Sequence, residues 1–173
     1  MKKIMGMVLL ILCMGSMYYF SSQDGTKSST QSGKVVKVID EIREEITLKD
    51  SKLISIKDKV FNKLKQYGDK GYVVRKIAHF SIYACIGITM AYVIYLFSKK
   101  VFISSFLAFM LTTMYAYYDE YRQLSVTGRA GSLKDIFIDS CGALVGVGIF
   151  LILTVGFKSI KALFFKRVDY QKQ

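Results

Sequence analysis

The stretch from Tyr115 to Asp139 reads YAYYDEYRQLSVTGRAGSLKDIFID and separates two long apolar runs. Its ionisable and amide side chains include Asp119, Glu120, Arg122, Gln123, Arg129, Asp135 and Asp139. Because each flanking run is long enough to cross the hydrocarbon of a bilayer as a helix, the stretch predicts a polar connection between two membrane spans. Its chemistry depends on which other parts of the chain reach the same membrane face.

The composition is typical of an integral membrane protein. Hydrophobic residues make up 52% of the 173 residues, Tyr and Phe number 12 each, Trp and Pro are absent, and the mean hydropathy is +0.32. The net charge of +12 arises mostly from Lys and Arg that flank apolar runs or lie in one amphipathic segment. Anionic lipid head groups are the nearest partner for such charges. We therefore expect membrane lipids as partners and no binding to nucleic acid.

Four apolar runs predict four transmembrane helices, at about residues 4–20, 77–97, 101–118 and 136–157. The first run ends in bulky aromatic residues without a small-residue cleavage site, which indicates an anchor that is not removed. We predict an all-α fold, an integral membrane helical bundle of four transmembrane helices with amphipathic helices in the first extracytoplasmic loop. Residues 1–157 form the membrane domain in this prediction, and residues 158–173 form a basic cytoplasmic tail.

The first loop has a polar part and an amphipathic part. Residues 21–32 are rich in Ser, Thr, Gln and Gly, which favour local bonds to the backbone, so we expect a loop there. The segment at about residues 33–67 carries apolar side chains at helical spacing in two sets, which begin at Val35 and Ile56. These sets predict two amphipathic helices on the membrane or on the bundle, ended by Gly68 and Gly71.

Basic residues in the short flanks indicate the orientation of the spans. Lys2, Lys3, Lys99, Lys100 and five basic residues of the tail share one side, which the positive-inside rule places in the cytoplasm. The thirteen Lys and Arg of the first long loop argue for the opposite orientation. On the short flanks, we predict a multi-pass plasma membrane protein with both termini in the cytoplasm.

Four span ends meet at one membrane face in this topology. They are the end of the first span at Phe20, the start of the second at Arg75, the end of the third at Asp119 and the start of the fourth at Asp135. Almost every ionisable residue in or near a span therefore belongs to one layer, and such an arrangement is expected of a functional site.

The second span begins with three polar side chains spaced by four residues. Arg75, His79 and Tyr83 therefore form one stripe on its opening turns. A lone His near the interface can also be structural, paired with a carboxylate that holds helices together. The spacing by itself leaves both interpretations open.

The fourth span begins with two carboxylates on one face. Ser132-Leu133-Lys134-Asp135 has the form of a capping box, which gives Asp135 a structural role at a helix start. Asp139 lies one turn deeper in an apolar run, where an unpaired carboxylate is costly. We expect it to meet one of three nearby cationic residues, Arg75, His79 or Arg129.

Two adjacent carboxylates close the third span. Asp119 and Glu120 point in different directions on a helix, so at most one of them is expected to face the cavity of Asp139. Together with His79 they suit general acid and base chemistry or oxygen ligation of a divalent cation. The spacing is not that of a zinc site, so we predict no metal site, and the sequence does not indicate a cofactor.

Gly128-Arg129 predicts a turn that directs an Arg back towards the bundle. Arg75 and Arg129 together could hold a phosphate or a carboxylate. By contrast, residues 142–146, Gly-Ala-Leu-Val-Gly, predict a face for close helix packing, and the tyrosines between residues 115 and 121 predict an aromatic belt at the interface.

The motifs at the span ends resemble those of the VanZ-like membrane proteins. In chain order they are Phe20-Ser21-Ser22-Gln23, Arg75-Lys76-x-x-His79-Phe80-x-x-Tyr83, Asp119-Glu120-x-x-Gln123, Gly128-Arg129 and Asp135-x-x-x-Asp139. The resemblance covers the chain apart from the amphipathic insert and the tail. Arg122 stands where the family commonly has a His, which leaves His79 as the only imidazole. Thr127 stands where it commonly has a Pro, which removes a rigid turn residue.

The resemblance implies a role in the cell envelope. The founding member of the family is associated with reduced susceptibility to the glycopeptide antibiotic teicoplanin. Such resistance fits a protein at the outer membrane surface, where peptidoglycan precursors are exposed. The resemblance supplies no agreed catalytic residues.

Two hypotheses follow from the sequence. In the first, the polar cluster binds or acts on an anionic envelope component, such as a lipid-linked cell-wall precursor, and lowers glycopeptide susceptibility. Its residues then have three roles: anion binding by Arg75 and Arg129, proton transfer by His79 with Asp119 or Glu120, and support from Gln123, Asp135 and Asp139. In the second, the same charges only clamp the helices, and the protein is a scaffold or interaction module. Whether it is an enzyme stays open, as does its oligomeric state, and no Ser or Cys has a base at motif spacing.

Overall fold

The structure is a computed structural model that describes residues 1–47, 70–129 and 131–170. Within these ranges the chain forms α1 (Lys2–Ser21), α2 (Gly25–Thr47), α4 (Lys70–Ser98), α5 (Val101–Gln123) and α6 (Leu133–Tyr170). Four of them, α1, α4, α5 and residues 133–161 of α6, are long and apolar enough to cross a membrane. The predicted all-α membrane bundle of four spans is therefore confirmed.

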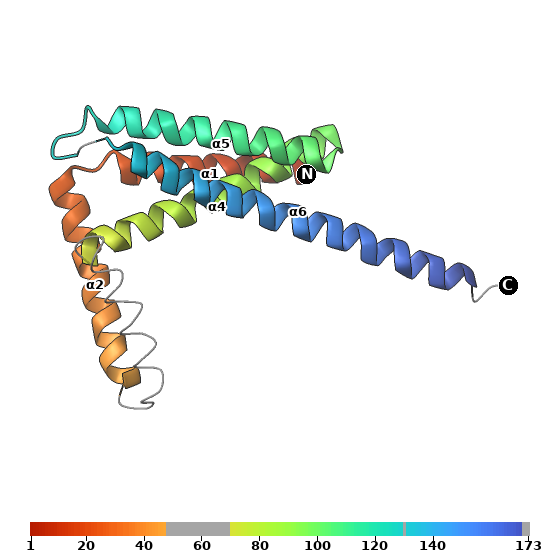
Figure 1. The fold of residues 1–173 in the computed structure, drawn as a ribbon, viewed down its shortest axis with the longest axis horizontal. Helices are drawn as coiled ribbons and strands as arrows, with labels where there is room; N and C mark the ends of the chain where they lie inside the picture. The colour runs from red at the N-terminus through yellow and green to blue at the C-terminus, as the bar shows by residue number, and fades with distance from the viewer. Residues whose placement is uncertain (48–69, 130, 171–173) are drawn as a thin grey trace.

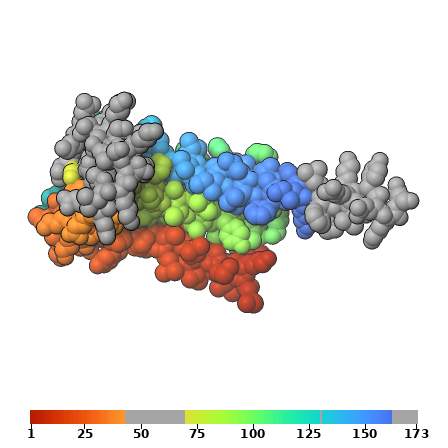
Figure 2. All heavy atoms as spheres, turned by 90° about the horizontal axis from the view of Figure 1, so that it is seen from below, coloured from red at the N-terminus to blue at the C-terminus, as the bar shows by residue number. Residues whose placement is uncertain are grey.

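The four apolar helices run side by side, and α2 leaves the end of α1 across their direction (Figure 1). Both chain termini lie at the opposite end from α2, and α6 continues beyond the bundle towards the C-terminus (Figure 1). Figure 2 shows α4 between α1 and α6, with which it packs. The end of α1, the start of α4, the end of α5 and the start of α6 therefore share one end of the bundle, as predicted.

Small residues bring α4 and α6 into close contact. A Cβ atom added at Gly142 or Gly146 would collide with the backbone carbonyl oxygen of Phe80 or Ala84, and one at Gly87 would lie 2.7 Å from the carbonyl oxygen of Ala143. The glycines thus let the two backbones approach as in other membrane helix pairs. The predicted close-packing face at residues 142–146 is confirmed.

The buried face of α5 is small and polar. Ser104, Ser105, Ala108, Thr112 and Ala116 are buried along it, and its last turns bury three larger polar side chains, Asp119, Glu120 and Gln123. The helix therefore packs closely along most of its length. It ends in polar groups at the face where the other span ends meet.

The prediction of a loop at residues 21–32 is wrong, because α2 begins at Gly25. Hydroxyl groups in its first turns bond within the helix: Thr30 donates to the carbonyl oxygen of Thr26 over 2.9 Å, and Ser32 donates to that of Ser29 over 2.9 Å. These bonds satisfy the side chains inside the helix, and packing of α2 against α4 supports it.

The first predicted amphipathic helix is confirmed as part of α2, which leaves Val35, Ile39 and Ile42 exposed. Gly71 does not end a helix, because α4 begins one residue earlier at Lys70, whose ammonium pairs with Asp40 of α2 at 2.7 Å. The second predicted amphipathic set and Gly68 lie outside the described residues. At the other end of the chain, α6 continues through most of the predicted tail, to Tyr170.

Candidate functional site

Asp119 is the centre of a polar network that joins α5 to α1. Its carboxylate is buried, with a relative exposure of 1% for the residue. One oxygen, Oδ2, accepts hydrogen bonds from Ser21 Oγ at 2.7 Å and from Gln123 Nε2 at 3.0 Å. The other, Oδ1, accepts from Arg122 Nη2 at 2.9 Å. Asp119, Arg122 and Gln123 meet because they lie three and four residues apart on the last turns of α5.

Arg122 extends this network to the end of α1. Its Nη1 donates to Ser22 Oγ over 2.8 Å, and its guanidinium lies 4.3 Å from the centre of the Tyr18 ring. Arg122 therefore ties α5 to α1 at the position where a His was expected from the resemblance. Its spacing of three residues from Asp119 indicates the pair with that carboxylate, whereas its contacts with α1 could not be found from the sequence.

Glu120 holds the start of α6. Its Oε1 accepts the backbone N–H of Ser132 at 2.6 Å, and the residue is 3% exposed. Ser132 Oγ accepts the N–H of Lys134 at 3.2 Å. The capping box predicted with Asp135 is therefore wrong, because a carboxylate of another helix binds the N–H that Asp135 was expected to bind.

Asp135 turns instead towards α4, where its carboxylate pairs with the ammonium of Lys76. Both side chains are largely buried, at 12% and 19% exposure. Sequence reasoning did not single out Lys76 as a site residue, although Lys76 directly follows Arg75. The ion pair joins the first turns of α4 and α6.

His79 meets Asp139 across the contact between α4 and α6, as one of the three predicted pairings. His79 Nδ1 and Asp139 Oδ2 lie 3.6 Å apart, and Asp139 is 1% exposed. Both atoms are buried, and neither has a hydrogen-bond partner among the residues that the structure describes. The hydroxyl of Tyr83 lies one turn further along α4. It is also buried and has no hydrogen-bond partner among the described residues. Arg75, His79 and Tyr83 thus form the predicted stripe, at increasing depth.

The loop between α5 and α6 directs Arg129 back to the bundle, as predicted. Gly128 has a φ of +74°, and the N–H of Arg129 donates to the carbonyl oxygen of Val126 over 3.1 Å, which is the pattern of a type II turn. Thr127 occupies the second position of this turn, where Pro is favoured but not required. Its carbonyl oxygen accepts the N–H of Gly25 at 3.2 Å, so the loop also holds the start of α2.

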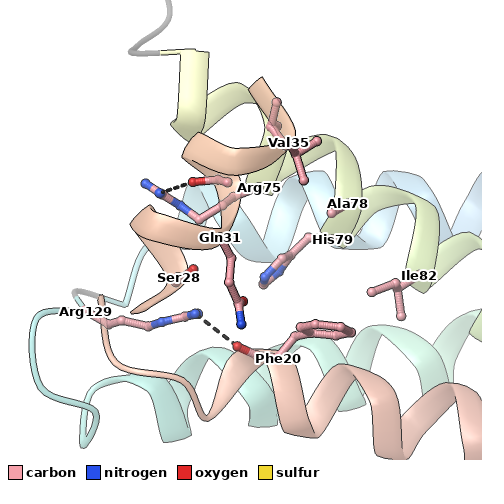
Figure 3. A pocket seen from close by; sticks show the side chains of 11 residues that line it. Phe20, Ser28, Gln31, Val35, Arg75, Ala78, His79, Ile82 and Arg129 are labelled. Atoms are coloured by element: carbon pink, nitrogen blue, oxygen red, sulfur yellow. Dashed lines mark hydrogen bonds between the residues drawn. The ribbon is translucent and has the colours of Figure 1, made fainter. Parts of the chain in front are cut away.

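Among the described residues, the guanidinium of Arg129 donates only to neutral groups. They are the carbonyl oxygen of Gln23 at 3.0 Å, Gln123 Oε1 at 3.0 Å and the carbonyl oxygen of Phe20 at 3.1 Å, the last drawn in Figure 3. Burial lowers the pKa of Arg129 from its usual value, nearby Asp119 raises it, and Arg75 lowers it further. The two guanidinium groups therefore lie within electrostatic range of one another.

Arg75 also has a neutral partner. Its Nη1 donates to Ser32 Oγ of α2 over 3.1 Å, and Figure 3 shows the side chain reaching towards that helix. In the described part of the chain neither Arg75 nor Arg129 forms an ion pair with a carboxylate, whereas Lys76 and Arg122 each form one. Of these four cationic residues, Arg75 and Arg129 are therefore the two without a carboxylate counter-ion in the described structure.

A polar cavity of about 190 Å³ lies between these residues. Its lining includes Arg75, Lys76, His79, Gln123, Arg129 and Asp135. The cavity thus brings together both predicted anion-binding residues, the predicted proton-transfer residue His79 and two of the supporting residues. Asp119, Glu120 and Asp139 lie behind it and bond or pair with other protein groups, and their predicted chemical roles stay predictions.

Within the described ranges, no group of three or more His, Cys, Asp and Glu side chains is close enough to hold a metal ion. The charges of the cavity lining also favour an anion, since three cationic side chains face it against one carboxylate, Asp135. That carboxylate is already paired with Lys76. The arrangement is suited to hydrogen bonding of a phosphate or a carboxylate.

A family model described as VanZ/LLP1 matches residues 7–154. The chain belongs to the VanZ/LLP1 family. The match contains α4 and α5 whole, most of the other two spans and every residue of the polar cavity, so the site is part of the family domain of this VanZ-like protein. Comparison with curated proteins and with solved structures finds no significant match.

Four residues to which the sequence analysis gave no role complete the site of this VanZ-like protein. They are Ser21, Ser32, Lys76 and Arg122. Each forms a contact between two helices far apart in the sequence. Only the three-dimensional structure shows such contacts, because the local sequence does not indicate which helix packs against which.

Proposed function

We propose that this VanZ-like membrane protein binds the anionic group of an envelope component in the polar cavity. The group is a phosphate or a carboxylate, such as that of a lipid-linked cell-wall precursor. Binding lowers susceptibility to glycopeptide antibiotics of the teicoplanin type, as the family resemblance implies. One observation carries the proposal: Arg75 and Arg129 line the same cavity, and neither has a carboxylate partner in the described residues.

The electrostatics of the cavity support an anionic ligand. A half-buried guanidinium is stabilised by a counter-ion, and two guanidinium groups within electrostatic range of each other raise the need for one. A phosphate or carboxylate between Arg75 and Arg129 satisfies both with charge-assisted hydrogen bonds. Lys76 and Arg122 have less to gain, because each already pairs with a carboxylate.

His79 is the group best placed for any proton transfer to a bound ligand. Its ring lines the polar cavity, and Asp139 lies behind its Nδ1 atom at 3.6 Å. A carboxylate that hydrogen-bonds to an imidazole orients it for proton transfer, and closure of this gap would form such a bond. We assign Asp119 and Glu120 a different role, since Asp119 accepts hydrogen bonds from Ser21, Arg122 and Gln123, and Glu120 accepts one from the start of α6.

A second candidate function is supported by these same carboxylate contacts. Asp119 ties α5 to α1, Glu120 ties α5 to α6, and Asp135 ties α6 to α4. In this candidate the charges serve only to hold the helices, and the protein acts as a scaffold through the exposed apolar side chains of α2. It assigns no ligand to Arg75, and the following experiment separates the two candidates.

Isothermal titration of the purified protein in a nonionic detergent with inorganic diphosphate tests the anion site. We expect saturable binding to the wild type and its loss in Arg75→Gln. The charge-matched control is Lys134→Gln, an exposed position at the start of α6, which should bind as the wild type does. Ser32→Ala removes the side-chain hydrogen-bond partner of Arg75 but leaves the charge of Arg75 in place, so diphosphate binding should persist. Equal binding by Arg75→Gln and the wild type would favour the scaffold.

We also propose that the cavity faces the outside of the plasma membrane, with both termini in the cytoplasm. Clusters of Lys and Arg in the short flanks near the termini support this orientation. Ser125 lies exposed in the loop at the cavity end. A Cys introduced there should react with an impermeant maleimide on intact cells. Reaction only after the cells are opened would reverse the orientation.

A further inference from the structure

A second cavity, of about 180 Å³, adjoins the polar one on the side of α1, α2 and α4. Its apolar lining is Phe20 of α1, Val35 of α2, and Val74, Ala78 and Ile82 of α4. Figure 3 shows Phe20, Val35, Ala78 and Ile82 on one side of the view and Arg75 and Arg129 on the other, with His79 between the two sets. The structure therefore places an apolar cavity directly beside the cationic one.

The two cavities are adjacent and share part of their lining. Ser28, Arg75, His79 and Arg129 line both of them. A molecule that places an anionic group between Arg75 and Arg129 therefore has apolar space next to that group.

The helical geometry of α4 explains why a cationic and an apolar row lie side by side. Val74, Ala78 and Ile82 are spaced by four residues and form a row along the helix. Arg75 and His79 follow the first two members of that row by one residue each. The apolar row lines the second cavity, and Arg75 and His79 of the neighbouring row line both cavities.

The apolar cavity borders side chains that lie on the surface of the bundle. Phe20 is 46% exposed and Val35 is 47% exposed, although both are large and hydrophobic. α1 and α4 are long and apolar enough to span a membrane, and exposed apolar side chains of such spans face lipid. The exposed Phe20 of α1 therefore places one wall of the apolar cavity near the lipid-facing surface of the bundle.

Resting on the proposed anion site, we infer that the ligand of this protein is an amphiphile with a phosphate head group and a hydrocarbon chain. The phosphate lies in the polar cavity between Arg75 and Arg129. The part of the chain nearest the head group lies in the apolar cavity against Phe20, Val35 and Ile82. The remainder of the chain stays in the bilayer.

The two cavities contribute differently to recognition. A hydrocarbon chain that leaves the bilayer for an apolar cavity exchanges one apolar environment for another, so it gains little free energy. The head-group phosphate gains the charge-assisted hydrogen bonds. Charge at Arg75 therefore provides selectivity among lipids, and the apolar cavity fixes where the chain of a selected lipid lies.

Because the chain contains no Trp, a single introduced Trp gives an unambiguous fluorescence probe. Phe20→Trp is a conservative change inside the apolar cavity, and Val35→Trp is a second probe on the opposite wall. Tyr19→Trp is the matched control, because Tyr19 is the preceding residue, is 59% exposed and does not line the cavity. Each variant is reconstituted in phosphatidylcholine vesicles that contain a minor fraction of phosphatidylglycerol.

Bromine atoms are placed on the acyl chains of either the phosphatidylglycerol or an equal amount of the phosphatidylcholine. We expect brominated phosphatidylglycerol to quench the fluorescence of Phe20→Trp more strongly than brominated phosphatidylcholine does, and the same preference in Val35→Trp. The preference should be absent in Tyr19→Trp. It should also be lost when Arg75→Gln is combined with either cavity probe.

Failure of this inference and failure of the anion site are distinguishable. Equal quenching by both brominated lipids at Phe20→Trp and Val35→Trp, together with diphosphate binding that depends on Arg75, overturns the amphiphile and leaves the anion site standing. Equal quenching without diphosphate binding overturns both. A quenching preference that survives Arg75→Gln also overturns the inference, since the chain would then be placed without its head group.

Discussion

Ser21 Oγ donates a hydrogen bond to Asp119 Oδ2 over 2.7 Å, and both residues are buried where the end of α1 meets the end of α5. This bond joins residues 98 positions apart in the sequence. It sets the position of the α1 end, whose backbone oxygen at Phe20 accepts a hydrogen bond from Arg129. The cavity that Arg129 lines therefore depends on how α1 docks.

Ser21→Ala should destabilise the protein by about 1–3 kcal/mol, because it leaves a buried carboxylate oxygen with one donor fewer. Thermal unfolding in detergent measures the change. Ser29→Ala is the control, since Ser29 is exposed on α2 and its hydroxyl forms no hydrogen bond in the described structure. Equal unfolding temperatures for the two variants would show that the Ser21 bond contributes no stability.

Glu120→Ala should release the start of α6, because the N–H of Ser132 loses its acceptor. Hydrogen exchange followed by mass spectrometry should show faster exchange in the peptide that covers residues 131–136. Glu120→Gln keeps an acceptor oxygen and should exchange at an intermediate rate. Protection that is unchanged in Glu120→Ala would mean that the N–H of Ser132 has another acceptor.

The packing of α4 against α6 predicts opposite outcomes for two neighbouring glycines. Gly146→Ala places a Cβ against the carbonyl oxygen of Ala84, and overpacking of this kind costs about 1–3 kcal/mol or more. Gly148→Ala has nothing within 4 Å of the added Cβ and should leave stability unchanged or raise it slightly. Yield of folded protein by size-exclusion chromatography and thermal unfolding compare the pair. Equal loss in both variants would contradict the close approach of the two helices.

Thr127→Pro should stabilise the loop by about 0.4–1 kcal/mol, because the second position of a type II turn suits the fixed φ of Pro. The N–H of Thr127 donates no hydrogen bond to another backbone group of the described structure, so Pro sacrifices none. The expected result is a higher unfolding temperature. A lower one would show that the turn does not have the type II geometry.

Much of the fold followed from the sequence, because hydropathy and length determine which segments can cross a bilayer. The glycines of residues 142–146 also indicated their role, since small residues at helical spacing are used for close helix contacts. A carboxylate such as Asp139 needs a polar partner in an apolar helix, and His79 of α4 lies beside it. Each of these conclusions depends on a physical requirement, such as a partner for a carboxylate in an apolar helix, that can be inferred from the local sequence.

Other features depended on which helices become neighbours. The sequence predicts a loop at Ser32, but this residue lies in α2. Its hydroxyl donates to the carbonyl oxygen of Ser29 and accepts a hydrogen bond from Arg75 of α4, and both bonds support the helix. Asp135 has the spacing of a capping residue, yet Lys76 pairs with it and Glu120 takes its expected place. Such contacts between helices are absent from local patterns. The sequence therefore indicated which polar residues gather at one end of the bundle, and the structure shows which of them are partners.

The central claim, that Arg75 and Arg129 make an anion site for an envelope lipid, is tested most directly by native mass spectrometry. The wild type is released from mixed vesicles of phosphatidylglycerol and phosphatidylcholine, with Lys134→Gln as the charge-matched control. We predict that the wild type and Lys134→Gln retain phosphatidylglycerol in preference to phosphatidylcholine. Arg75→Gln should show no preference between the two lipids. Equal retention of phosphatidylglycerol by Arg75→Gln and the wild type would contradict the account.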